Sequence, residues 1–219
     1  MLSDPFEMAI VHRAFRVELD NAAGLIRGVA AGDNRRSAVV GSHIDFMMTA
    51  LHHHHLAEDA VVWPMLDARA PSRTAEVTRM EDAHRGITDT SERVRDTTAR
   101  WAESGDPWLA GQLVPLVQKL ASRVDEHFDD EERSVVPLIA EYLNPKEWRK
   151  FLAHGSAFVR AHPKLGLALG GMVLAGESAE NRNRFLSNVP LFARVPFKMF
   201  GDRIFAGYRA EVYGLSPPG

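Results

Sequence analysis

The chain has 219 residues, of which 45% are hydrophobic and 25% are charged, and its formal net charge is -3. This composition is that of an ordinary globular protein, and the charge gives no electrostatic basis for nucleic-acid binding. Cysteine is absent, which excludes disulfides, thiolate metal sites, iron–sulfur clusters and a cysteine nucleophile. The most apolar stretch, residues 165–176, is too short to span a bilayer. Because no signal peptide is predicted either, we expect a cytoplasmic protein.

The first predicted helix covers residues 5–31. Asp4 is expected to cap it, with Pro5 at the first helical position and Glu7 closing a capping box. The sequence Gly-Asp-Asn that follows residue 31 predicts its end. Its apolar residues recur at helical spacing; they are Met8, Val11, Phe15, Leu19 and Ala22.

Three further long helices are predicted, over residues 37–68, 72–104 and 107–143. Three prolines lie inside these segments, and we expect kinks or breaks at Pro64, Pro115 and Pro137. Short loops between long amphipathic helices imply antiparallel neighbours. The sequence therefore predicts an all-α fold, in which residues 1–144 form an antiparallel up-down-up-down four-helix bundle.

Residues 145–219 differ from the bundle in pattern. Short helices are predicted over residues 146–155, 178–187 and 196–213, and residues 156–176 are apolar and interrupted by glycine. We expect a helical C-terminal extension that packs on the bundle. The alternative is a segment that binds a protein partner, which the sequence does not identify, or a membrane surface.

Two segments of the predicted bundle repeat each other. LHHHHLAEDAVVWPML (residues 51–66) aligns without gaps with VDEHFDDEERSVVPLI (residues 124–139). Residues at positions i and i+4 lie on one helix face, so a His and a Glu project together in each segment. Imidazole and carboxylate groups are ligands for iron and similar divalent ions. The matched pairs are His54 with His127, Glu58 with Glu131 and Pro64 with Pro137.

The position of each histidine along its helix provides an independent test of whether these residues can form one metal site. His12 lies as far before Ala31 as His54 lies after Arg35. In the second helical hairpin the separation from residue 84 to residue 104 likewise equals that from residue 107 to residue 127. Residues equally far from a connecting turn lie at the same level of an antiparallel pair. One histidine from each helix therefore lies in a common layer, namely His12, His54, His84 and His127.

These residues resemble the hemerythrin-like HHE family, of the bacterial type with a C-terminal extension. The resemblance covers roughly residues 5–155, and it includes Trp63-Pro64 after the first pair. It implies two non-heme iron ions with an oxo or hydroxo bridge, joined by the carboxylates of Glu58 and Glu131 and otherwise held mainly by histidine. It also implies a small diatomic or peroxide ligand.

The chain departs from the oxygen-carrying hemerythrins on the third helix. Where they have a second histidine one helical turn after the ligand His84, this chain has Thr88. Three alternatives can complete the second iron: His55, a solvent position, or Glu81, one turn before His84. The expected metal ligands are His12, His54, His55, Glu58, His84, His127 and Glu131.

Other polar residues near the motifs are expected to have different roles. His52 and His53 are rotated away from the layer on their helix, so we expect them to face solvent. Asp59 and Glu132 are expected to be neighbours of the ligands rather than ligands. His43 is expected to be a hydrogen-bonded histidine near one end of the bundle.

Three functions are compatible with this pattern. The first is a di-iron protein that reacts with hydrogen peroxide or dioxygen, including catalase-like disproportionation of peroxide. The second is a non-catalytic binder or sensor of oxygen, nitric oxide or iron, and the third is a structural protein in which iron only stabilises the bundle. Carrier, sensor and enzyme can share one set of ligands, and these ligands do not separate iron from manganese or zinc.

Overall fold

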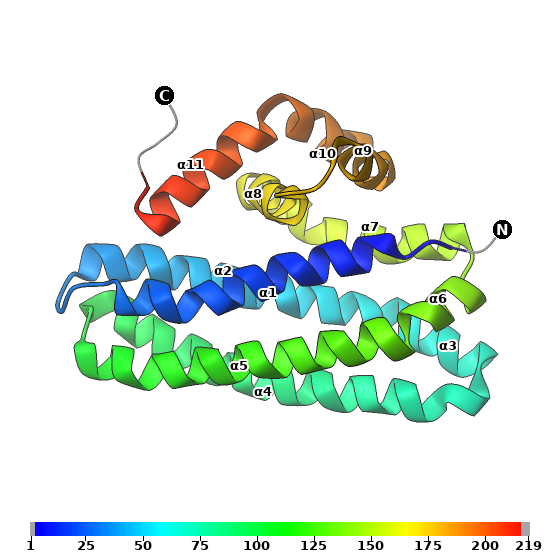
Figure 1. The fold of residues 1–219 in the computed structure, drawn as a ribbon, viewed down its shortest axis with the longest axis horizontal. Helices are drawn as coiled ribbons and strands as arrows, with labels where there is room; N and C mark the ends of the chain where they lie inside the picture. Colours follow the sequence, from blue (N-terminus) through cyan, green and yellow to red (C-terminus); the bar gives the residue numbers. More distant parts are fainter. Residues whose placement is uncertain (1–2, 216–219) are drawn as a thin grey trace.

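The structure is a computed structural model that describes residues 3–215, without the side chains of residues 155–160. Over these residues the chain forms helices and no strand, which confirms the predicted all-α class. Figure 1 shows the long helices side by side, with the last part of the chain lying across one side of them. None of the described helices is long and apolar enough to cross a membrane.

Four long antiparallel helices form the bundle: α1 (Phe6–Arg27), α2 (Asn34–Ala57), α4 (Thr74–Ser104) and α5 (Pro107–Ser134). Each packs against the next in chain order, and α5 packs against α1. The loops between α1 and α2 and between α4 and α5 meet at one end, where Gly32 N–H donates to the Gly105 carbonyl at 2.9 Å. Gly105 has a φ of 61°, and a Cβ there would lie 2.9 Å from the backbone nitrogen of Asp33. Only glycine fits this close approach.

The helices become irregular directly after both His/Glu pairs. After α2 the chain forms a π-helical turn, η1 (Glu58–Val62), and then α3 (Trp63–Arg69) and the 3₁₀ turn η2 (Pro71–Arg73). At the end of η1, Trp63 N–H bonds to the carbonyl of Glu58, as in a π-helix. After α5, Val135 separates that helix from α6 (Val136–Tyr142). The irregularities expected near Pro64 and Pro137 are thus present, whereas Pro115 does not interrupt α5.

The predicted capping box at the start of α1 is wrong. The helix begins at Phe6, and Pro5 precedes it without any side-chain capping bond. Glu7 is instead 1% exposed, and its two carboxylate oxygens accept hydrogen bonds from Trp148 Nε1 at 3.0 Å and Asn188 Nδ2 at 2.6 Å. Long-range donors have therefore replaced the local backbone donor that a capping box would use.

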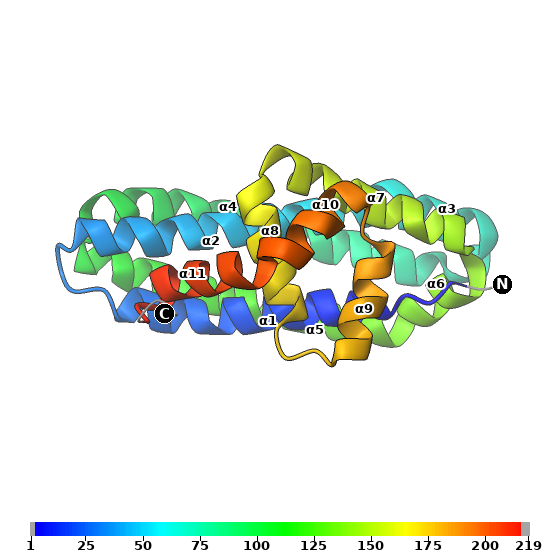
Figure 2. The ribbon, with the colours of Figure 1, turned by 90° about the horizontal axis from the view of Figure 1, so that it is seen from above.

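The C-terminal helices lie over α1 and α2. They are α7 (Pro145–Ala161), α8 (Pro163–Leu174), α9 (Ala179–Asn188), α10 (Leu191–Pro196), the π turn η3 (Phe197–Gly201) and α11 (Asp202–Tyr213). Seen from above, α8 and α9 cross the bundle axis and α11 runs along it (Figure 2). Apolar residues of these helices join the bundle core: Met172, Val173, Leu174, Leu186 and Phe197. The boundary between two units at residue 144 stays a prediction.

Polar contacts also hold the C-terminal helices on the bundle. Arg13 of α1 donates to the carbonyls of Val173 and Ala175, both at 3.0 Å. Buried His43 of α2 has its Nδ1 atom 2.8 Å from the hydroxyl oxygen of Tyr208. His43 is therefore a hydrogen-bonded histidine, as predicted, but its partner comes from the extension.

Candidate metal centre

Seven polar side chains from the four long helices and η1 converge inside the bundle. Six of them are buried, and the side chain of His54 is 9% exposed. They form two groups in which the nitrogen or oxygen atoms lie within 4.8 Å of one another: His55, Glu58, His84 and His127 in one, and His12, His54 and Glu58 in the other. The structure thus brings together all of the residues that the sequence predicted as ligands. Glu131 belongs to neither group but lies beside both of them.

The two glutamates lie between the two groups. Glu58 Oε1 is 3.1 Å from His54 Nε2, and Glu58 Oε2 is 3.4 Å from His84 Nε2. Glu131 Oε2 is 3.5 Å from His12 Nε2 and 3.8 Å from His127 Nε2. Each carboxylate therefore faces one imidazole of each group.

Consecutive histidines at the end of α2 reach different groups. The His54 ring lies edge-on to His12, with the two Nε2 atoms 3.1 Å apart. The His55 ring stacks on His84, with centroids 4.1 Å apart and an interplanar angle of 15°. The Nε2 atom of His55 is buried and makes no hydrogen bond within the described part of the chain. Of the alternatives for the missing histidine, His55 lies with His84 and His127, whereas Glu81 belongs to neither group among the described residues.

Carboxylates outside the cluster fix the orientation of two imidazoles. His84 Nδ1 lies 2.7 Å from Asp59 Oδ1, and this oxygen also accepts a bond from Trp63 Nε1 at 2.8 Å. With a proton on Nδ1, the lone pair of Nε2 points into the cluster. Bonds of this kind fix the tautomer of metal-binding histidines and raise their basicity.

A carboxylate outside the cluster likewise fixes the orientation of the His12 imidazole, in the other group. Its Nδ1 atom lies 2.9 Å from Glu132 Oε1, which also accepts a bond from Arg16 at 2.8 Å. Arg16 was not singled out from the sequence, although it lies one helical turn after His12 on the same helix face.

Burial sets the charge state of the cluster. It raises the pKa of Glu58 well above its ordinary value and the pKa of Glu131 to about 8. It lowers the pKa of His54 and His55 well below the ordinary value, and that of His127 to about 2. These histidines are therefore neutral, which is the form that binds metal.

The cluster fits a metal because its polar atoms lack other partners. All four carboxylate oxygens of Glu58 and Glu131 are buried, and the two carboxyl groups lie close to each other and to imidazole nitrogens, with no other described side chain donating to them. Nε2 atoms also face each other at 3.1 Å, in His12 with His54 and in His84 with His127. Unpartnered buried acids and opposed lone pairs are unfavourable. Cations between them would satisfy both.

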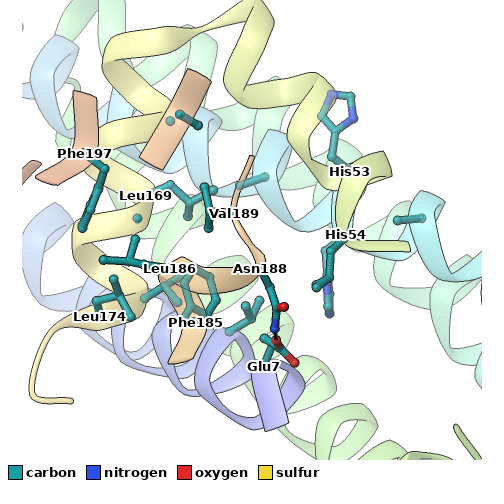
Figure 3. A pocket seen from close by; sticks show the side chains of 18 of the residues that line it. Glu7, His53, His54, Leu169, Leu174, Phe185, Leu186, Asn188, Val189 and Phe197 are labelled. Atoms are coloured by element: carbon teal, nitrogen blue, oxygen red, sulfur yellow. Dashed lines mark hydrogen bonds between the residues drawn. The ribbon is translucent and has the colours of Figure 1, made fainter. Parts of the chain in front are cut away.

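Nearby histidines of the run take other positions. His52 is exposed, as predicted. The prediction that His53 faces solvent is wrong in part, because the C-terminal helices cover it and leave it half-buried beside Phe151 and Leu152 at a shared cavity. Figure 3 shows the rings of His53 and His54 leaving α2 in different directions.

An antiparallel four-helix bundle with buried, converging histidines and glutamates defines a class of cation-binding helical proteins. Residues 7–139 match the family model described as the Hemerythrin HHE cation binding domain, and the chain belongs to this family. No match was found among curated proteins or among solved structures.

Proposed function

We propose that the cluster holds two non-heme iron ions, one in each group of side chains. The ligands would be His12 and His54 on one side, His55, His84 and His127 on the other, and Glu58 and Glu131 between them. The observation that carries this proposal is the position of the two glutamates, each facing an imidazole of both groups. A single ion would not need two such carboxylates.

The two sides differ in the number of imidazoles. Three histidines belong to the group that contains His84, and two belong to the group that contains His12. His55 thereby occupies the side on which oxygen-carrying relatives use the histidine replaced here by Thr88. More room for a small exogenous molecule is left on the side of His12 and His54.

We propose that the protein reacts at this side with hydrogen peroxide or dioxygen. Two iron ions would supply the electron exchange needed to disproportionate peroxide, in which two H2O2 give two H2O and one O2. The protein provides neutral imidazoles, two carboxylates that balance the metal charge, and the hydrogen bonds of Asp59 and Glu132. Phe128 stacks on His12 with centroids 3.8 Å apart and keeps bulk water from this ring.

A second candidate, a non-catalytic sensor of oxygen, nitric oxide or iron, is favoured by one contact. Arg13, the residue after His12, is bonded to two carbonyls at the end of α8 and paired with Glu177 at 2.7 Å. A displacement of His12 would thus be transmitted to the C-terminal helices through Arg13.

Metal analysis and an optical spectrum of aerobically purified protein test the proposal. We expect two iron ions per chain, near-ultraviolet charge-transfer absorption and no heme Soret band. One metal ion or none per chain in natively folded protein from iron-replete cells would overturn the di-iron assignment.

Addition of peroxide then separates the two candidates. Sustained evolution of O2, measured with an oxygen electrode, supports the catalytic function. No turnover, together with protease sensitivity of residues 145–215 that changes with the iron state, supports the sensor. If neither occurs, the metal has a structural role.

A further inference from the structure

A cavity of about 220 Å³ lies between the bundle and the C-terminal helices. Val11, Phe15 and His54 line it on the bundle side, and Leu169, Val189 and Phe197 line it on the other (Figure 3). The cavity is partly open to solvent. A cavity of this size at the junction of two packed layers is typical of a ligand site.

The lining selects an uncharged ligand. It is almost entirely apolar and contains no lysine or arginine among the described residues. Glu7 is the one carboxylate that the described part of the chain places in the wall, and both of its oxygens are already engaged, by Trp148 and by Asn188. An anion would find no cation to pair with in this lining, and a cation would have to displace these bonds, so the wall favours a neutral apolar molecule.

The volume sets the size of this molecule. An apolar cavity of ~150 Å³ holds benzene, so about 220 Å³ accommodates roughly ten carbon atoms. Water is a poor occupant, since it needs two to four polar partners, which this lining does not offer.

The cavity adjoins the metal centre on one side only. His54 lines the cavity, whereas His55, His84 and His127 do not. This is the side with two imidazoles, where the proposed function leaves room for an exogenous molecule. The opposite wall, from Leu169 to Phe197, lies outside residues 7–139, so the region that matches the family model does not build the cavity alone.

We propose that this cavity binds a neutral, apolar organic molecule of about ten carbon atoms, with one end against His54. The idea that this molecule reacts at the metal centre rests on the proposed function, whereas the idea that the cavity binds it does not. The two are therefore tested separately.

The first experiment measures binding to the full chain with naphthalene, a neutral aromatic hydrocarbon of the proposed size whose fluorescence reports binding, with and without bound metal. 1-Octanol and octanoate then compete for the probe at a pH at which octanoate is charged. We expect saturable binding of one probe per chain, and displacement by 1-octanol at a concentration lower than that of octanoate by about tenfold or more. Equal competition by octanoate, or no saturable binding, would overturn the proposal while leaving the di-iron assignment intact.

Variants locate the probe. Leu169→Trp and Val189→Trp fill the cavity from the C-terminal side, and neither residue is itself a proposed metal ligand. Each should weaken probe binding by about tenfold or more. The control Leu165→Trp is on the same helix as Leu169 but does not line the cavity, so it should change binding by less than about twofold. Equal effects of all three variants would place the probe elsewhere.

A structural measurement needs no variant and covers the case in which a variant does not fold. Crystals of the wild-type protein are soaked with 1-bromooctane, and the bromine is located by anomalous scattering. Bromine between α8 and α1 supports the proposal. Bromine found only at other sites contradicts it.

Discussion

The Nδ1 atom of His84 lies 2.7 Å from Asp59, and that of His12 lies 2.9 Å from Glu132, so the two carboxylates have equivalent roles. Each directly follows the glutamate that lies between the two groups, and each holds an imidazole from a neighbouring helix. Asp59 and Glu132 also occupy matching positions when the two His/Glu segments are aligned. The repeated unit therefore contains three functional positions, His, Glu and the acidic residue after it.

Removing one of these outer carboxylates should weaken metal binding without removing a ligand. Asp59→Ala frees the His84 ring to reorient, and we expect a loss of about 10- to 100-fold in metal affinity. Asp59→Asn keeps an acceptor oxygen and should lose less. Competition with a chelator of known affinity measures the change, and Asp67→Ala, at an exposed position of α3, is the matched control. An affinity for Asp59→Ala equal to that of the control contradicts this role.

Loss of a glutamate between the groups should be more severe than loss of a histidine. Glu58→Ala or Glu131→Ala removes a ligand and a negative charge from both sides at once, whereas His12→Ala affects one side. Both glutamate variants should lose most of their iron and melt at a lower temperature, because metal binding is coupled to folding. Elemental analysis and thermal denaturation measure these effects. Retention of both ions in either variant would show that another carboxylate joins the groups.

The stability of the metal-free protein should depend on pH through Glu131. Its pKa is raised from 4.5 to about 8 in the folded state, so the folded chain keeps a proton that the unfolded chain loses. The stability it contributes is complete below pH 4.5 and is lost as the pH rises through about 8. Within this window the contribution of Glu131 to the free energy of unfolding should fall by up to about 1.4 kcal/mol per pH unit.

Glu131→Gln does not titrate and isolates this effect. In chelator-treated protein, the free energy of unfolding of the wild type minus that of the variant should decrease with rising pH. Urea denaturation at several pH values measures the difference. A difference independent of pH would mean that Glu131 ionises in the folded state as it does in the unfolded chain.

The four consecutive histidines should differ sharply in their effect on iron binding. His52→Ala/His53→Ala should keep the iron, because neither residue belongs to either group. His54→Ala should lose iron, and His55→Ala should shift the charge-transfer bands and alter the reaction with peroxide. Iron content and absorption spectra of these variants decide the matter. An empty site in His52→Ala/His53→Ala would mean that the assignment of ligands on α2 is wrong.

Tyr208→Phe tests how the extension is held. The change removes the hydroxyl group that lies 2.8 Å from Nδ1 of buried His43. A buried polar atom left without a partner costs about 1–3 kcal/mol, so the free energy of unfolding should fall by that amount while the iron content stays unchanged. A variant as stable as the wild type would show that His43 finds another partner.

The helices of the bundle could be predicted because their signals are local. Helical spacing of apolar residues, Gly32 and Gly105 at the turns, and Asp106 before α5 all act over short distances in the sequence. Glu7 was misassigned because Trp148 and Asn188, which hold it, are far away in the sequence. A capping box and a buried long-range hydrogen bond are compatible with the same short sequence.

Two matched motifs and a common level along the helices select the candidate ligands other than His55, whereas His55 was proposed from the resemblance to the HHE family. The sequence did not show to which of the two groups His55 belongs. Each residue of a helix advances by about 100°, and the rotation of α2 about its axis depends on packing and on the π turn after Ala57. No pattern in the sequence indicated the cavity. Its walls come from α1 and α2 and from helices that follow much later in the chain.

Hydrogen bonds to the C-terminal helices hold α1 at several points along its length. Glu7 is bonded to α7 and α9 near one end, Arg13 to the end of α8, and Glu18 to the Tyr213 hydroxyl of α11 at 2.7 Å. This helix contributes a single residue to the two groups, His12, while α4 and α5 lie on the far side of the bundle from the extension (Figure 1). Because the extension is also bonded to α2, through His43 and Tyr208, its displacement would act on both helices that carry His12 and His54. Unequal movement of α1 and α2 would change the 3.1 Å separation of these two histidines.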